Sequence, residues 1–143
     1  MKYVGKIELN RKIDITDPCY KKGTWCRLTT ECEPGEYHGY VNMSNKGDWG
    51  IRVASLSIFK DRKKVPLKKM ECIGTIGVDA GLAGFFNDKP DFSNEEWTEL
   101  CHAIETGDAW NMYNGIFSSS GFGDGLYQVF ANPERNAFTI KFL

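Results

Sequence analysis

The feature that most constrains this chain is an alternation of apolar and polar residues with a period of two. It is clearest in residues 3–9, 12–16, 37–43 and 137–143. Successive side chains of a β-strand point to opposite faces of the sheet, so this period is typical of strands with one face against a core. Proline and glycine turn signals separate the runs. The pattern predicts antiparallel β-sheet.

Turn signals place the individual strands. The run that begins near Tyr3 continues through Ile15 and ends at Thr16-Asp17-Pro18, because proline offers no backbone donor to a sheet. Asn45-Lys-Gly-Asp48 and Asn132-Pro-Glu-Arg-Asn136 are typical of hairpin loops. We expect the remaining strands at 24–29, 37–43, 49–59, 126–131 and 137–143, with Phe138, Ile140 and Phe142 on one face.

One helix is predicted, beginning at Ser93. Ser93-Asn-Glu-Glu96 has the form of a capping box, in which the serine hydroxyl and the glutamate carboxylate each accept from the other's backbone amide. An apolar stripe that should pack on the sheet follows at helical spacing: Trp97, Leu100, Cys101 and Ile104. Gly107 is expected to end the helix. The prediction is an α+β fold, predominantly antiparallel β, a sandwich or a roll, with one main helix near 93–106 in a single β-rich domain spanning 1–143.

The charge balance argues against a protein that follows a nucleic-acid backbone. Lys plus Arg number 18 and Asp plus Glu number 19, giving a net charge of -1. Locally the signs separate, since residues 60–69 carry six basic residues and one acid, whereas 71–110 carry nine acids and one lysine. No Tyr or Trp lies between the cations of 60–69, so we expect a solvated, exposed loop there.

Membrane, metal and secretory signals are missing from the sequence. The longest apolar stretch, 73–86, is interrupted by Asp79 and four glycines, so we expect no membrane association. The first twelve residues mix both charge signs, unlike a signal peptide, which favours a cytoplasmic location. The five cysteines form no C-x-x-C pair and the two histidines, His38 and His102, have no metal-ligand spacing. We therefore predict reduced thiols and no cofactor.

Three aspartates lie where predicted strands meet turns: Asp17, Asp79 and Asp124. Each has proline, alanine or glycine neighbours that allow a tight turn or close approach to a ligand. Two interpretations follow. Each carboxylate could accept from its own turn backbone, or the three loops could converge on a shared ligand or metal site. The spacing does not match an EF-hand or a phosphate-binding loop.

A few further residues are candidates for chemistry or binding. Cys19 is the best-placed thiol, since it lies in a turn, although a buried inert thiol is the alternative. Cys101 is expected in the core. Trp49, Trp110 and Phe122 are flanked by polar or glycine residues in predicted loops, which is typical of binding aromatics.

Three ordered motifs resemble those of an uncharacterised family of small bacterial and phage proteins. They are Asp17-Pro-Cys-Tyr20, the stretch from Gly77 to Phe86, and the stretch from Ser120 to Val129. The resemblance covers the chain from about residue 13 to the C-terminus, and implies one β-rich domain in a cytoplasmic bacterial or phage setting. It marks these motif positions: Asp17, Cys19, Tyr20, Asp79, Gly81, Gly84, Gly121, Asp124, Gly125 and Tyr127.

The function predicted from the sequence is a non-enzymatic module that binds a small molecule or a host protein. An activated nucleophile, a base with its orienting partner, or a metal cluster is not evident among sequence neighbours. The candidate ligand-binding residues are Asp17, Cys19, Tyr20, Asp79, Gly81, Phe122, Asp124 and Tyr127. One alternative is a metal-assisted or acid/base hydrolase or transferase that uses the aspartates. The other is a structural or assembly protein in which an exposed strand edge or the acidic helix contacts another chain.

Overall fold

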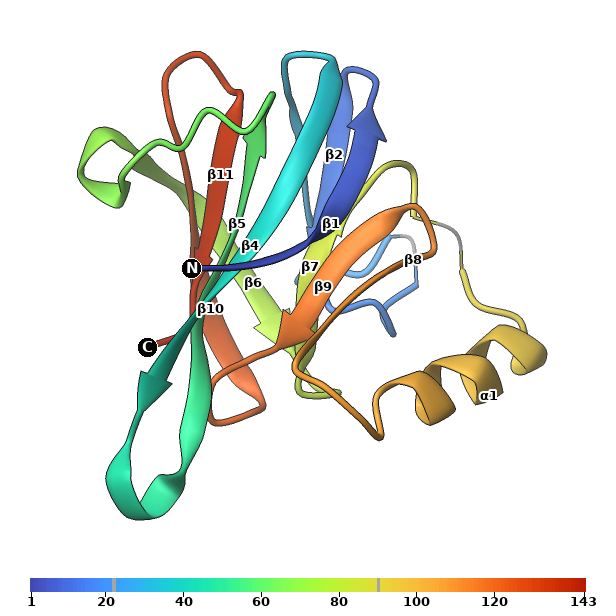
Figure 1. Ribbon diagram of the computed structural model, residues 1–143. Coiled ribbons are helices and arrows are strands. Elements are labelled where there is room, and N and C mark those ends of the chain that lie inside the picture. Colours follow the sequence, from blue (N-terminus) through green and yellow to red (C-terminus); the bar gives the residue numbers. More distant parts are fainter. Residues whose placement is uncertain (22, 90) are drawn as a thin grey trace.

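The chain folds into two antiparallel sheets packed face to face (Figure 1). The computed structural model describes residues 1–21, 23–89 and 91–143. One sheet has six strands in the order β1 (Lys2–Leu9), β4 (Gly35–Asn45), β5 (Ile51–Lys60), β11 (Ala137–Lys141), β10 (Gly125–Ala131) and β6 (Glu71–Val78). The other has five, in the order β3 (Leu28–Glu31), β2 (Lys12–Thr16), β7 (Leu82–Phe86), β9 (Gly115–Ser119) and β8 (Ala109–Met112). The predicted mostly antiparallel sandwich with one helix is confirmed.

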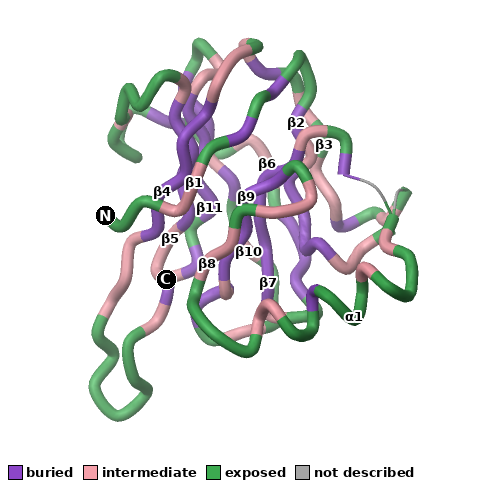
Figure 2. The backbone as a smooth tube through the Cα atoms, turned by 45° about the vertical axis from the view of Figure 1, so that its right-hand side comes forward, coloured by how far each residue is buried: buried purple, intermediate pink, exposed green. Residues whose placement is uncertain are grey.

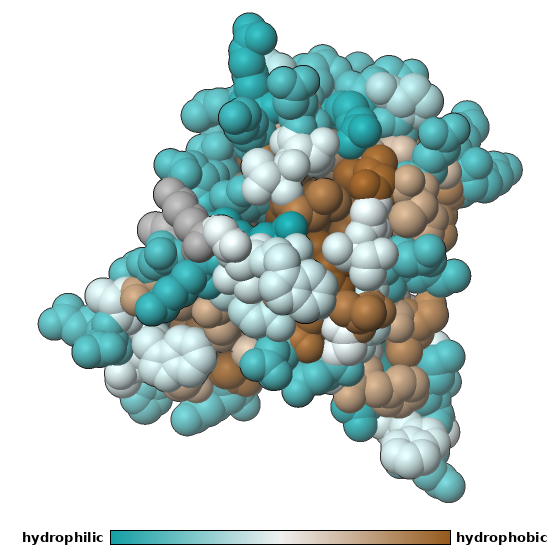
Figure 3. Space-filling view, turned by 180° about the vertical axis from the view of Figure 1, so that it is seen from behind, coloured by the Kyte–Doolittle hydropathy of each residue, from teal (hydrophilic) through white to brown (hydrophobic). Residues whose placement is uncertain are grey.

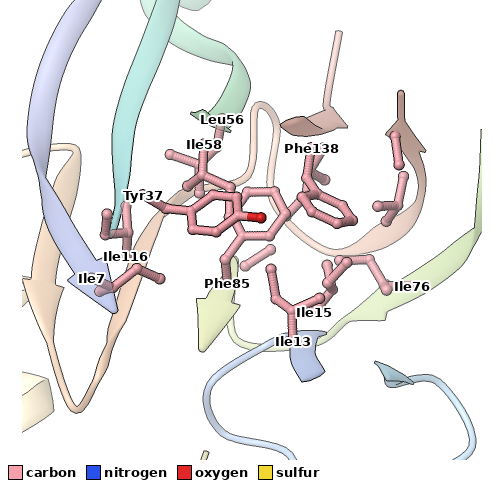
Figure 4. Packing of buried hydrophobic residues seen from close by; sticks show 14 of the residues in the cluster. Ile7, Ile13, Ile15, Tyr37, Leu56, Ile58, Ile76, Phe85, Ile116 and Phe138 are labelled. Carbon is pink, nitrogen blue, oxygen red and sulfur yellow. The ribbon is translucent and has the colours of Figure 1, made fainter. Parts of the chain in front are cut away.

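The core lies between the sheets and is built from the apolar residues of the alternating runs. Tyr37, Phe85 and Phe138 come from three strands of the two sheets and meet at its centre, with ring centroids 6.4 Å apart in the pairs Tyr37–Phe138 and Phe85–Phe138 (Figure 4). Tyr37 is fully buried, and its hydroxyl donates to the Glu33 carbonyl at 2.6 Å, which removes the cost of burying a polar group. Each such side chain contributes about 1.5–3 kcal/mol when it leaves water.

Two contacts join the edges of one sheet to the other. The Gly77 amide of β6 donates to the Cys26 carbonyl at 3.1 Å, just before β3. The Asn111 side chain of β8 donates to the Lys6 carbonyl of β1 at 3.2 Å. These bonds occupy part of the hydrogen-bonding capacity of the outer strands, which reduces the edge available for pairing with another chain.

Helix α1 (Asn94–Ala103) begins as predicted but packs less tightly than predicted. The Ser93 hydroxyl accepts from the Glu96 amide at 3.2 Å, and the Glu96 carboxylate accepts from the Ser93 amide at 3.0 Å. Leu100 is buried, whereas Trp97 and Cys101 are exposed, and much of the helix surface is open (Figure 2). The expectation that Cys101 lies in the core is wrong. Leu100 packs with Phe86, Phe117 and Leu82 on the outer face of the five-stranded sheet. Only a narrow part of the apolar stripe of the helix therefore contacts this sheet.

Three other segments differ from the prediction. The segment expected as a strand at 24–29 forms a turn first, in which the Arg27 amide donates to Thr24, and β3 begins only at Leu28. The basic segment after β5 contains a short 3-10 helix, Leu67–Lys69, and another follows β4 at Gly47–Trp49. Met70 is buried and packs with Tyr40 and Phe59 on the outer face of the six-stranded sheet. Residues 61–69 are exposed as predicted, except for Val65, which is partly buried against this cluster. The helix also ends at Ala103, before the predicted stop at Gly107.

Among the described residues, no helix is both long and apolar enough to cross a lipid bilayer.

Candidate functional site

The Asp17 turn is joined to the Asp79 turn through the Asp17 carboxylate. Asp17 is fully buried, and its Oδ1 accepts from the Cys19 amide at 2.8 Å. Its Oδ2 accepts from the amides of Asp79 and Ala80 at 2.9 and 2.7 Å. The Tyr20 amide donates to the Asp17 carbonyl at 3.1 Å and closes the turn. One carboxylate therefore serves three backbone donors from two distant segments.

The Asp124 turn joins the same assembly through its backbone. The Ser120 amide donates to the Gly81 carbonyl at 3.1 Å, and Gly125 pairs with Val78 across β10 and β6. The Tyr127 hydroxyl lies 2.6 Å from the Gly123 carbonyl, to which it donates, and 3.1 Å from that of Ser120. We call residues 17–20, 79–81 and 120–125 the turn cluster.

The turn cluster matches neither sequence interpretation in full. Its three turns do converge, but through backbone groups and the single carboxylate of Asp17, while Asp79 and Asp124 are exposed. Within residues 1–21, 23–89 and 91–143, no three His, Cys, Asp or Glu side chains lie close enough together to hold a metal ion. The cluster lies where the chain passes from β6 to β7 and from β9 to β10, between the two sheets. Its arrangement stabilises these crossings.

The environment of Cys19 makes its thiol unreactive. Burial, together with the nearby Asp17 carboxylate, raises the pKa of Cys19 to about 12. A thiolate is the nucleophilic form, so little of it exists at neutral pH. Burial also raises the pKa of Tyr20, with a contribution from its hydrogen bond to Cys26. These two motif residues therefore suit packing better than acid/base chemistry.

The loop aromatics singled out by sequence fall into two kinds. Trp110 is structural, because its indole N–H donates to the Ala103 carbonyl at 3.0 Å and its ring stacks on Phe117. Trp49 and Phe122 are exposed and meet edge to face with centroids 6.3 Å apart. The Arg52 guanidinium lies 5.6 Å from the Phe122 ring centroid, at the β4–β5 hairpin that projects from the sandwich in Figure 1.

Exposed apolar surface also lies away from that hairpin. Figure 3 shows apolar side chains gathered in the middle of the face seen from behind, inside a border of hydrophilic ones. Trp25 is 87% exposed, more than any other large hydrophobic residue in the described part of the chain. A tryptophan this exposed gains little from folding, and its indole face is open to contact with another ring.

Trp25 lines a groove of about 960 Å³ beside the outer face of β2 and β3. The segment 87–88 that follows β7 borders the groove, as does the connection 10–12 between the first two strands. Its lining mixes a tryptophan, cationic side chains and short polar ones: Asn10, Arg11, Lys12, Asp14, Gly23, Thr24, Trp25, Arg27, Thr29, Pro34, Asn87 and Asp88.

A nearly buried ion pair helps to line this groove. Arg27 and Asp14 approach to 3.3 Å, and their side chains are only 6% and 12% exposed. The Asp14 carboxylate also accepts from the Thr29 hydroxyl at 2.8 Å and from the Lys89 amide at 2.9 Å. Arg27 donates to the Tyr20 carbonyl at 3.4 Å. These partners hold the guanidinium in one place beside the groove, with its charge balanced by Asp14.

A smaller groove, of about 390 Å³, lies next to the N-terminus of α1. Cys19, Tyr20 and Trp97 line it together with Lys89, whose Nζ lies 4.5 Å from the Phe92 ring centroid. Lys89 is almost fully buried, and burial lowers its pKa. Two of the predicted candidates, Cys19 and Tyr20, thus line this smaller groove.

Sequence reasoning missed the larger groove. None of its lining residues was a candidate, because 24–29 was expected to be a strand with Trp25 as one of its residues. The available signal was the run Gly23-Thr-Trp-Cys-Arg27, which places an aromatic and a cation two residues apart after the Asp17 turn. Comparison of the chain with protein-family models, with curated protein sequences and with solved structures finds no match.

Proposed function

We propose that the groove beside β2 and β3 is a non-enzymatic binding site that holds a small anionic molecule with a planar ring. The observation that carries the proposal is the placement of exposed Trp25 and the Arg27–Asp14 ion pair around one space. The resemblance in the three motifs favours a bacterial or phage protein of the cytoplasm, so the captured molecule would be a metabolite of the host.

The ring is inferred from Trp25. An exposed indole offers a flat face on which another ring can stack, worth about 1–3 kcal/mol for a nucleobase. The groove volume of about 960 Å³ lies within the range of small-molecule sites.

The anionic group is inferred from the cations. Arg27 is positioned by Asp14 and Tyr20, and Arg11 and Lys12 lie at the same groove. An arginine fork matches the geometry of a carboxylate or a phosphate, and Thr24 and Asn87 add uncharged hydrogen-bonding groups.

The enzymatic alternative based on clustered aspartates finds little support. Asp17 has both carboxylate oxygens engaged by backbone amides and no exposed surface, so neither a substrate nor a metal ion can reach it without breaking the turn cluster. Protein capture, the other form of a binding module, would use the exposed pair Trp49 and Phe122.

Saturation-transfer NMR with a panel of nucleoside 5′-monophosphates and aromatic carboxylates tests the proposal. We expect at least one compound to bind the wild-type chain, and its signal to be lost in Trp25→Ala and in Arg27→Met. Trp49→Ala is the matched control, since it removes another exposed tryptophan far along the chain and should bind as the wild type does. Absence of binding across the panel, or equal binding by all variants, would contradict the proposal.

A further inference from the structure

A chain of hydrogen bonds links three side chains on the outer face of the six-stranded sheet. The Tyr3 hydroxyl lies 2.8 Å from His38 Nδ1, and His38 Nε2 lies 2.7 Å from Glu36 Oε1. Tyr3 pairs across the ladder near His38, because β1 and β4 are antiparallel neighbours. His38 is only 4% exposed, whereas Tyr3 is 42% exposed. A hydroxyl, an imidazole and a carboxylate in this order form the arrangement that activates a nucleophile.

The ionised carboxylate gives the chain a direction. Glu36 has a lowered pKa because of its hydrogen bond to His38 and because Lys6 lies 3.7 Å away. In the neutral imidazole, Nε2–H then donates to Glu36, and Nδ1 carries the lone pair. Nδ1 is therefore the acceptor for the Tyr3 hydroxyl proton.

One cationic side chain lies over the Tyr3 ring and another over the neighbouring Tyr40 ring. The Arg62 guanidinium lies 4.9 Å from its centroid, and Lys64 lies 4.8 Å from the centroid of Tyr40, which meets Tyr3 edge to face at 5.4 Å. The basic segment lacks aromatic residues in sequence, but the sheet supplies them in space. Cations beside a nucleophile favour an anionic electrophile.

The turn that holds Arg62 over Tyr3 has an unusual backbone. Asp61 and Arg62 both have positive φ, 53° and 60°, and the Lys63 amide donates to the Lys60 carbonyl at 3.0 Å across them. Asn-Gly is the usual pair at such positions, because positive φ is sterically unfavourable for most other residues. Tyr113 and Asn114, between β8 and β9, share this conformation, so the contribution of the turn at 61–62 is to place Arg62 over Tyr3.

We propose that Tyr3 is a nucleophile that accepts the phosphoryl group of an activated phosphate ester, with His38 as general base. This activity is independent of the small-molecule groove. Arg62 binds the phosphate oxygens, and Glu36 is a positioning residue that orients His38. In the reaction the Tyr3 oxygen forms a bond to phosphorus while the bond from phosphorus to the leaving oxygen breaks. The phenol proton passes to His38 Nδ1 and from there to the departing oxygen, so no oxidant or second cofactor is required.

para-Nitrophenyl phosphate is the probe, with the modification read by peptide mass spectrometry. We expect a mass increase of one phosphoryl group on the peptide that contains Tyr3, with release of one equivalent of nitrophenol. Tyr3→Phe should abolish both, and His38→Gln should slow them by about 100-fold or more. Tyr127, whose hydroxyl donates to backbone carbonyls, is the internal control and should stay unmodified. No increase on Tyr3, or an unchanged rate in folded His38→Gln, would overturn the proposal.

Glu36→Gln separates positioning from a merely structural role. The charged and titratable groups facing His38 are Tyr3 and Lys6 from β1, Glu36 from β4, and Arg62 and Lys64 from the following loop. Loss of the carboxylate removes the acceptor that orients His38, so the maximal rate of Tyr3 phosphorylation should fall while the concentration of para-nitrophenyl phosphate at half-maximal rate stays unchanged. An unchanged maximal rate in folded Glu36→Gln would overturn the role assigned to Glu36.

Discussion

Asp17 and Asp14 lie three residues apart, yet they belong to regions of different kind. Both accept backbone amides from distant segments, at 79–80 for Asp17 and at 89 for Asp14. Asp17 is satisfied by amides on both oxygens and has no exposed surface. Asp14 shares its charge with Arg27, which lines a groove. A carboxylate whose two oxygens accept from backbone amides stabilises the fold, whereas a carboxylate that positions a cation at a groove contributes to a binding site.

The largest expected effect separates the two regions through stability. Asp17→Ala leaves three amides without their acceptor, so we expect the free energy of unfolding to fall by about 3 kcal/mol or more. Chemical denaturation measures the loss. Asp124→Ala, a change to an exposed aspartate of the same cluster, is the control and should alter stability by about 0.5 kcal/mol or less. If Asp17→Ala were as stable as the wild type, the contrast between the Asp17 and Asp14 regions would be wrong.

A double substitution tests the ion pair at the groove. In Arg27→Met, the nearly buried Asp14 carboxylate loses its cation, so we expect the free energy of unfolding to fall by about 1–3 kcal/mol. We also expect affinity for the compounds of the NMR panel to fall about tenfold or more. Asp14→Asn added to Arg27→Met should recover part of the stability and none of the affinity. Recovery of binding by the double variant would show that Arg27 acts only on the fold.

Thiol reactivity sharpens the assignment of Cys19 to the structural region. With its pKa raised to about 12, Cys19 should be alkylated by iodoacetamide at pH 8 much more slowly than the exposed Cys72 and Cys101. Time-resolved peptide mass spectrometry gives the order. Early modification of Cys19 would show that the turn cluster opens or that its thiol is activated.

The smallest expected effect lies outside both regions. The pKa of Glu33 is lowered by its hydrogen bond with Lys60 at 2.6 Å, and further by Asn136. A carboxylate with a lowered folded pKa adds stability above its unfolded pKa, and this is lost as pH falls through the folded value. Glu33→Gln should therefore unfold slightly more easily at pH 7 and match the wild type near pH 2. A difference that persists in acid would point to packing instead.

The sequence predicted the sheets well because period-two alternation reports directly on which side chains face a core. The capping box at Ser93 was equally informative, since it is a local arrangement of four residues. The exposure of Cys101 was not predictable, because it depends on where a short helix docks. The three motifs indicated turns but left open whether those turns converge, and only the coordinates show that one Asp17 carboxylate joins two of them. The groove combines segments far apart in sequence, and the two-residue spacing of Trp25 and Arg27 also fits a strand, so this signal alone did not indicate a groove.

Chemical-shift mapping by ¹⁵N NMR tests most directly the claim that the turn cluster is structural and that the groove binds. Titration with nucleoside 5′-monophosphates should shift amides of residues 10–14, 24–29 and 87–88 and the indole N–H of Trp25. It should leave residues 79–81 and 120–125 unchanged. Shifts concentrated in the turn cluster, or none anywhere at millimolar concentration, would contradict the account.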